Sequence, residues 1–148
     1  LTGGDFASHT NPIGPEVGKR LADVDRLERL DTVAVRTGWN LDVPMALAPV
    51  ENSRSRIATS ELDRVEIELP ATISDFSGDG YMVRGGTLTP LPAGSLLDGK
   101  KGRFTWQTVA GYIGDYDFVF VRQNADGSRQ RLPVRVTFTP KFGGEASD

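Results

Sequence analysis

Oxygen-bearing side chains repeat at alternate positions in the middle of the chain. Asp75, Ser77 and Asp79 occupy the first, third and fifth positions of a segment whose sixth position is Gly80. Calcium loops of the EF-hand kind have this spacing, because a hard cation needs six or more oxygen ligands and the glycine permits the turn between them. The twelfth position of such a loop needs an acidic ligand, but it is Gly86 here. The segment therefore predicts either a calcium site or an ordinary surface turn, which favours the same residue types.

A pair of carboxylates raises a second chemical possibility. Glu66 and Glu68 lie on the same face of an expected strand, about 7 Å apart by strand rise. Glycosidases use two carboxyl groups at roughly that range when they face each other across a cleft. A charged strand face that meets water is the alternative, and it is the one we expect.

Two aromatic residues fall in expected loops, Trp39 and Tyr112. An exposed ring can pack on the apolar face of a sugar, so this pair is a candidate carbohydrate platform. The alternative, which we favour, is that both rings cover the end of a folded core.

The chain has few side chains of the types that catalyse reactions. The only histidine is His9, in a leader rich in glycine and proline, and there is no cysteine. A side chain in such a segment cannot be held within reach of a nucleophile, and no G-x-S-x-G motif is present. We therefore predict no enzyme activity, no catalytic residue and no cofactor, with calcium as the one candidate metal.

Composition narrows the function further. The chain has 148 residues, of which 38% are hydrophobic and 25% charged, as in a soluble globular domain. The net charge of −3 argues against nucleic-acid binding, which needs a basic surface. No apolar run is long enough for a transmembrane helix. A start at Leu1 without a signal segment suggests a piece of a longer precursor.

Period-two patterns predict the strands. Phe104 and Trp106 alternate with polar residues, so both side chains should point to one face. The run 116–121 is aromatic and β-branched on both faces, which predicts a central strand. The clearest amphipathic strand is 62–69, with Val65, Ile67 and Leu69 inward and Arg64, Glu66 and Glu68 toward water. Further strands are expected at 32–37, 45–50 and 132–138, with a hairpin turn at Asp126-Gly127 and a solvated loop at 51–61. The run 81–88 is expected to be a strand broken at Gly85-Gly86, which predicts a bulge or a tight hairpin there.

Short strands separated by turn residues predict an all-β fold, an Ig-like antiparallel β-sandwich of about seven strands over residues 31–140. Residues 1–30 are interpreted as a leader or linker. Within it, apolar residues spaced three and four apart predict one short N-terminal helix over 16–30, with an extended segment as the alternative. Residues 141–148 are expected to form a flexible tail.

One motif has a counterpart in known proteins. Its positions are Leu91, Pro92, Gly94, Leu97, Asp98, Gly102, Phe104, Trp106, Gly114, Tyr116 and Phe120. This pattern resembles the Ig-like or cadherin-like repeats of bacterial exported proteins, although many of those continue Trp-Thr-Pro where this chain has Gln107 and Thr108 after Trp106. The resemblance implies an Ig-like sandwich in a larger secreted or cell-surface protein, and it implies no active site.

The resemblance also shapes the expected function. It implies a noncatalytic module that acts in structure, adhesion or assembly, with neighbouring domains of the precursor or another surface protein as partners. The alternatives are a carbohydrate- or calcium-dependent binding module and an accessory domain of a secreted hydrolase. Cadherin-like repeats hold calcium at their junctions, and Glu16, Asp23 and Asp25 are the acidic residues at the corresponding end of the domain.

Overall fold

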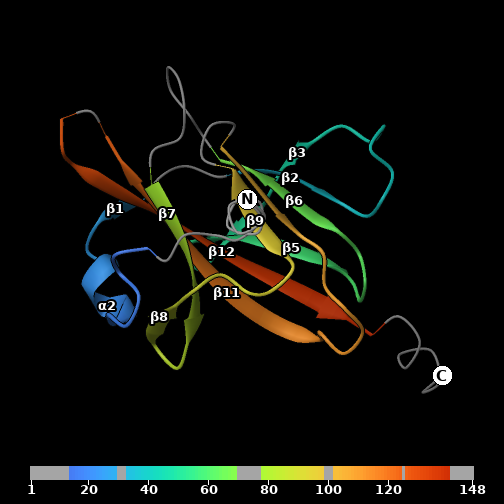
Figure 1. The fold of residues 1–148 in the computed structure, drawn as a ribbon. Coiled ribbons are helices and arrows are strands. Elements are labelled where there is room, and N and C mark those ends of the chain that lie inside the picture. The colour runs from blue at the N-terminus through green and yellow to red at the C-terminus, as the bar shows by residue number, and fades with distance from the viewer. Residues whose placement is uncertain (1–13, 30–32, 70–77, 99–101, 125, 141–148) are drawn as a thin grey trace, which may run out of the picture.

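Two β-sheets packed face to face form the described part of the chain, which in this computed structural model is residues 14–29, 33–69, 78–98, 102–124 and 126–140 (Figure 1). The larger sheet has the order β4 (Val50–Glu51), β5 (Arg54–Ser60), β12 (Arg129–Thr139), β11 (Gly114–Gln123), β7 (Gly78–Arg84) and β8 (Thr87–Thr89), and β1 (Glu28–Arg29) also pairs with β12. The smaller sheet has the order β3 (Ala46–Leu47), β2 (Ala34–Thr37), β6 (Val65–Glu68), β10 (Arg103–Trp106) and β9 (Ser95–Asp98). The predicted all-β sandwich is confirmed.

The strand order is that of an immunoglobulin sandwich. In the smaller sheet, β2, β6, β10 and β9 take the places of strands A, B, E and D, and in the larger sheet β12, β11 and β7 take those of G, F and C. Tyr116, near the start of β11, donates its hydroxyl hydrogen to the carbonyl of Ile113 at 3.2 Å, as the tyrosine corner of such domains does. The large buried Trp106 stands on β10 instead of on the C-strand equivalent β7.

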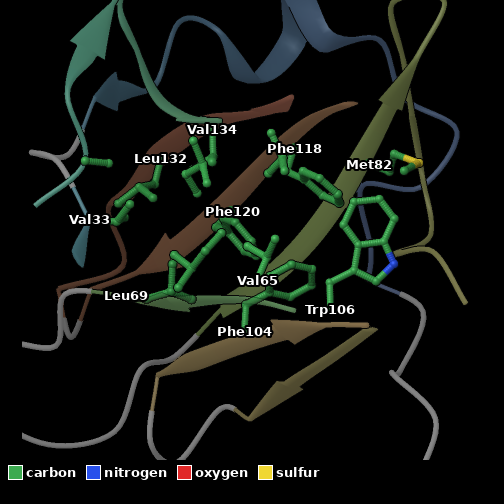
Figure 2. Packing of buried hydrophobic residues seen from close by; sticks show 14 of the residues in the cluster. Val33, Val65, Leu69, Met82, Phe104, Trp106, Phe118, Phe120, Leu132 and Val134 are labelled. Carbon is green, nitrogen blue, oxygen red and sulfur yellow. The ribbon is translucent and has the colours of Figure 1, made fainter. Parts of the chain in front are cut away.

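Aromatic side chains fill the space between the sheets. Phe104 and Trp106 are fully buried and point from the smaller sheet toward Phe118 and Phe120 of β11 (Figure 2). The Trp106 ring makes edge contacts with four other aromatic rings, and its Nε1 donates to the carbonyl of Ala93 at 3.2 Å. The predicted inward positions Val65, Ile67 and Leu69 are buried as well. The expected core is confirmed.

Glycines make the tight hairpin between β7 and β8. Gly85 and Gly86 both have positive φ, 57° and 76°, and the register pairs Arg84 with Thr87 around them. Two consecutive left-handed residues define the hairpin turn whose twist matches that of the flanking strands. The predicted break at these glycines is therefore a hairpin.

The expected solvated loop at 51–61 is wrong. Seven of its residues form β5, which runs parallel to β12 from Ser55 opposite Val134 to Ser60 opposite Thr139. The segment is rich in serine, threonine and arginine, so its period was not visible as an apolar alternation, although Ser55 and Ile57 are both buried. The strand expected at 45–50 divides into β3 and β4, which belong to different sheets.

The described N-terminal residues 14–29 lie against the outer face of the larger sheet, beside β7 and β8 (Figure 1). The helix within them is a single turn, α2 (Leu21–Val24), shorter than the sequence predicted. Backbone bonds join Gly18 and Lys19 to Leu88 at the edge strand β8. A second apolar cluster forms beneath this segment, from Val24, Tyr81, Leu88, Val119 and Val121. The predicted division into leader, sandwich and tail stays a prediction, because residues 1–13, 30–32 and 141–148 lie outside the described residues.

Candidate functional site: an apolar surface held by a buried ion cluster

Three connections meet at one end of the sandwich: 38–45 after β2, 61–64 after β5 and 107–113 after β10, at the right of Figure 1. Trp39 Nε1 donates to the carbonyl of Leu62 at 3.3 Å, which joins the first connection to the second. The amide of Gly111 donates to the buried Glu61 carboxylate at 2.7 Å, which joins the second to the third. Hydrogen bonds thus connect all three.

The 61–64 turn contains a residue in an unfavourable backbone conformation. Leu62 has φ of 74°, in the left-handed region that residues with a Cβ rarely adopt. Such a residue costs about 1–3 kcal/mol and persists where its surroundings hold it in place. Asp63 provides part of that support, because its carboxylate accepts hydrogen bonds from the Thr59 hydroxyl and the Ser60 amide. The turn therefore fixes the direction of the Leu62 carbonyl, which accepts the hydrogen bond from Trp39 Nε1.

Glu66 is the centre of a buried ion cluster, and its expected exposure to water is wrong. The residue is 1% exposed, and its Oε1 accepts from Arg36 Nη2 at 2.6 Å and from Arg64 Nη1 at 3.0 Å. Arg103 Nη1 lies 3.0 Å from Oε2. The guanidinium groups of Arg36 and Arg103 on the two neighbouring strands, and that of Arg64 just before β6, cover the carboxylate, which explains why an outward-facing side chain is buried.

The cluster determines the protonation of Glu66. Burial alone raises the pKa of this carboxyl, but the hydrogen bonds and charges of Arg36 and Arg64 outweigh it, so the pKa lies below its ordinary value. Three arginines around one carboxylate favour its charged form, so Glu66 is poorly suited to hold and pass on a proton near neutral pH. Glu68 lies at the edge of the cluster, 3.3 Å from Arg103 and half-exposed. The arrangement is that of a structural ion cluster and differs from two carboxyl groups facing across a cleft.

Arg36 connects the ion cluster to the 38–45 connection. Its Nη1 donates to the carbonyls of Leu41 and Val43, at 3.0 and 3.1 Å, while its Nε and Nη2 are bonded to Glu66. A planar guanidinium is suited to this, because its donors have fixed directions. The buried carboxylate therefore positions an exposed connection.

The 38–45 connection and the residues just after it expose an unusual number of large apolar side chains. Among the described residues, eight large hydrophobic side chains are exposed, and five of them fall within 39–50, between 43% and 73% exposed. These five are Trp39, Leu41, Val43, Leu47 and Val50, and they define what we call the 39–50 surface. Single exposed apolar residues are common, whereas a concentration of them marks an interaction site.

A groove adjoins the 39–50 surface where the chain crosses from the smaller to the larger sheet. Its volume is about 500 Å³, and it is lined mainly by apolar residues, Val35, Val43, Pro44, Ala46, Pro49, Ile57 and Ala58. Arg56 also lines it and donates from Nη1 to Glu51 at 3.0 Å. The buried Nε of Arg56 has no hydrogen-bond partner. This groove has no signal in the sequence, because it forms only when β2, β3 and β5 come together.

A second groove lies on the outer face of the larger sheet, beside α2. It has a volume of about 300 Å³, and its floor includes Val83, Val119 and Pro133. Asp117 lines it too and is bonded to Arg135 at 2.8 and 3.0 Å and to Arg54 at 2.9 Å. Burial raises the pKa of Asp117, but these arginines lower it below its usual range. This carboxylate is also held in an ion cluster.

The two aromatic candidates lie in different surroundings. Trp39 is 60% exposed on the 39–50 surface. Tyr112 is half-buried and its ring packs edge-on against Trp106, with 5.6 Å between ring centroids. Tyr112 therefore covers the end of the core while Trp39 faces solvent, and a carbohydrate role for the pair stays a prediction.

The calcium candidates are only partly visible. Asp75 and Ser77 lie outside the described residues, and Asp79 is in strand β7 opposite Val121. Burial raises the pKa of Asp79, and the charge of Glu16 adds to the increase. Glu16 itself is bonded to Arg129 at 2.7 Å and to Lys19 at 3.1 Å. No group of three acidic or histidine residues that could hold a metal occurs among the described residues, Asp23 and Asp25 included. The calcium site stays a prediction.

Comparisons with known proteins do not place this chain in a family. No protein-family model matches the chain, and no curated protein matches it. The chain is similar to an immunoglobulin domain in a crystal structure of a titin M10 and obscurin-like 1 complex, with 11% identity, a TM-score of 0.36, and coverage of 59% of this chain and 86% of that one. It is also similar to titin M4, with 11% identity, a TM-score of 0.33, and coverage of 74% and 100%. Since these likenesses are weak, the assignment of an immunoglobulin sandwich rests on the strand order. Within the described residues, no helix is long and apolar enough to cross a membrane.

Proposed function

We propose that this chain is a noncatalytic immunoglobulin-type module of a larger exported or cell-surface protein, with a role in structure, adhesion or assembly. The observation that carries the proposal is the 39–50 surface, where exposed apolar side chains are held by the Arg36 and Glu66 pair. The bacterial, cadherin-like origin suggested by the 91–122 motif belongs to the same proposal.

The rigidity of this surface favours binding. Ordering a loop on association costs free energy, and a loop that is already bonded to the core avoids most of that cost. Trp39 is the kind of residue that dominates binding energy in protein interfaces. Its indole nitrogen is already bonded to Leu62, so a partner can cover the ring without leaving that donor unpaired.

The charged residues support a noncatalytic role. The carboxyl groups of Glu16, Glu66 and Asp117 all have pKa values lowered by bonded basic side chains, after burial has been overcome. Catalytic acids and bases need pKa values near neutral pH, which these ion pairs prevent. These three carboxylates therefore stabilise the fold.

Detection on intact cells tests this proposal. An antibody raised against the chain should label unbroken cells of the source organism, and brief protease treatment of those cells should remove the signal. A cytosolic enzyme marker measured in parallel controls for lysis. A signal that resists protease until the cells are broken would contradict the proposal.

Carbohydrate binding is a second candidate, favoured by the 60% exposure of Trp39. The flat ring could stack on a sugar, with Asn40 and Asp42 beside it as polar groups. Titration with oligosaccharides, followed by tryptophan fluorescence, distinguishes this candidate. A saturable change that is lost in Trp39→Ser would favour it over the protein interface.

A further inference from the structure

We propose that the 39–50 surface binds the same surface of a second copy of this chain, with the Trp39 connection of each copy entering the groove beside β5 of the other. This inference rests on the proposed function and names the partner that the surface takes. The contact is isologous, because one surface supplies both halves.

The exposed residues of the 39–50 surface and the adjoining groove match in shape and polarity. Trp39 and Leu41 protrude, each about 60% exposed, from a connection that Arg36 holds in place. The groove of about 500 Å³ is lined mainly by aliphatic residues and prolines, and its size is within the range that admits a bulky ligand group. Protruding apolar side chains and an apolar recess are therefore present on one molecule.

The groove also carries a positive charge. The Arg56 side chain lines it and is 30% exposed, and its Nη1 donates to Glu51 at 3.0 Å. Asp42 lies between Leu41 and Val43 and is exposed, and its carboxylate makes no described ion pair. Entry of the Trp39 connection into the groove of a second copy would bring Asp42 to Arg56. In a twofold contact this ion pair forms twice.

The exposed connection and the groove lie next to each other on the molecule. Val43 belongs to both, since it is exposed on the 39–50 surface and also lines the groove. A twofold contact requires the protruding part and the recess to adjoin on one face, so that the symmetry axis passes between them. A partner of unrelated shape would need no such adjacency.

Sedimentation velocity of the full chain, from micromolar to millimolar concentration, tests the inference. We expect a concentration-dependent dimer, and Trp39→Ser should raise its dissociation constant by about tenfold or more. Val109→Ser is the matched control, because Val109 is 66% exposed at the same end but lies outside the 39–50 surface. That variant should dimerise like the wild type.

A charge exchange tests the contact itself. Asp42→Lys and Arg56→Glu should each weaken self-association, because each homodimer would bring two like-charged pairs together. An equimolar mixture should recover the dimer as a heterodimer, since one contact is then the native Asp42 and Arg56 pair and the other is the same pair with its charges reversed. Circular dichroism of each variant checks that it is folded.

Two results would overturn the inference: a wild-type chain that stays monomeric at millimolar concentration, or a dimer that Trp39→Ser leaves unchanged. Neither result bears on cell-surface detection, so the inference can fail while the proposed function stands. A dimer formed by a protein that is never detected at the cell surface would contradict the proposed function and still support the inference.

Discussion

Arg36 Nη2 lies 2.6 Å from Oε1 of Glu66, and the same guanidinium donates from Nη1 to the carbonyls of Leu41 and Val43. One side chain therefore joins a carboxylate that is 1% exposed to a connection that carries exposed apolar residues. A change in the buried cluster should therefore alter the exposed connection.

Removal of the central carboxylate should be costly. Glu66→Ala leaves three arginines without their common partner, and breaking a buried ion pair in this way costs about 3–5 kcal/mol. Urea denaturation measures the loss. Glu68→Ala is the matched control, because its half-exposed pair with Arg103 should contribute less than about 1 kcal/mol. Equal losses in the two variants would contradict a special role for Glu66.

Weakening the bonds of Arg36 should make the 38–45 connection more mobile without unfolding the domain. Arg36→Lys keeps a positive charge near Glu66 but cannot bond the carboxylate and two carbonyls together. We expect faster amide exchange at 40–44 and little change within β11. Unaltered exchange at 40–44 would show that the connection is held by other contacts.

Acid should destabilise the domain. Glu16, Glu66 and Asp117 have folded pKa values below their unfolded ones, which are about 4.3 for Glu and about 3.9 for Asp. The stability they contribute is therefore present above the unfolded values and is lost as the pH falls through the folded ones. Urea midpoints measured from neutral to acidic pH should decline in that window. A midpoint that holds or rises there would contradict the ion clusters.

The contribution of Asp79 to stability should change with pH in the opposite direction to that of Glu16, Glu66 and Asp117. Burial and the charge of Glu16 raise its folded pKa, so its contribution is favourable at low pH and is lost as the pH rises through that value. Asp79→Asn should therefore raise the urea midpoint at neutral pH.

Calorimetric titration with calcium tests whether Asp79 belongs to a calcium site. We expect neither heat nor a shift in Tm, because Lys19 and Arg129 already bond Glu16 beside Asp79. Binding that Asp79→Asn abolishes would establish the calcium site.

Trp106 should be the most sensitive core position. Its ring touches Tyr112, Tyr116, Phe118 and Phe138, and it is fully buried. Trp106→Ala is expected to cost about 3–5 kcal/mol in free energy of unfolding. Trp39→Ala is the control, since a 60% exposed ring leaves no cavity. A loss below about 1 kcal/mol at Trp106 would mean that the core can collapse around it.

The core could be predicted from the sequence because burial on one face of a strand appears as alternation along the chain. Phe104, Trp106, Val65 and Ile67 all follow that rule. The burial of Glu66 could not be predicted in this way, because its partners Arg36 and Arg103 belong to strands whose lateral order only the folded sheet reveals. Alternation also failed for β5, where buried Ser55 looks like a loop residue.

The candidate surface was only partly predictable. Trp39 was identified as an aromatic residue in a connection, but Leu47 and Val50 were assigned to a strand and gave no sign of facing solvent. The crossing between sheets at 48–49 exposes them, since β3 and β4 are short edge strands of different sheets. Exposure of an edge depends on which strand ends a sheet, and the local pattern does not contain that information.

Hydrogen–deuterium exchange of the intact chain at low and high protein concentration tests the central claim most directly. If the 39–50 surface, held by Arg36 and Glu66, binds a second copy of this chain, amides within 39–50 should become protected as concentration rises, while those of the 107–113 connection stay unchanged. Exchange at 39–50 that is independent of concentration would contradict the account.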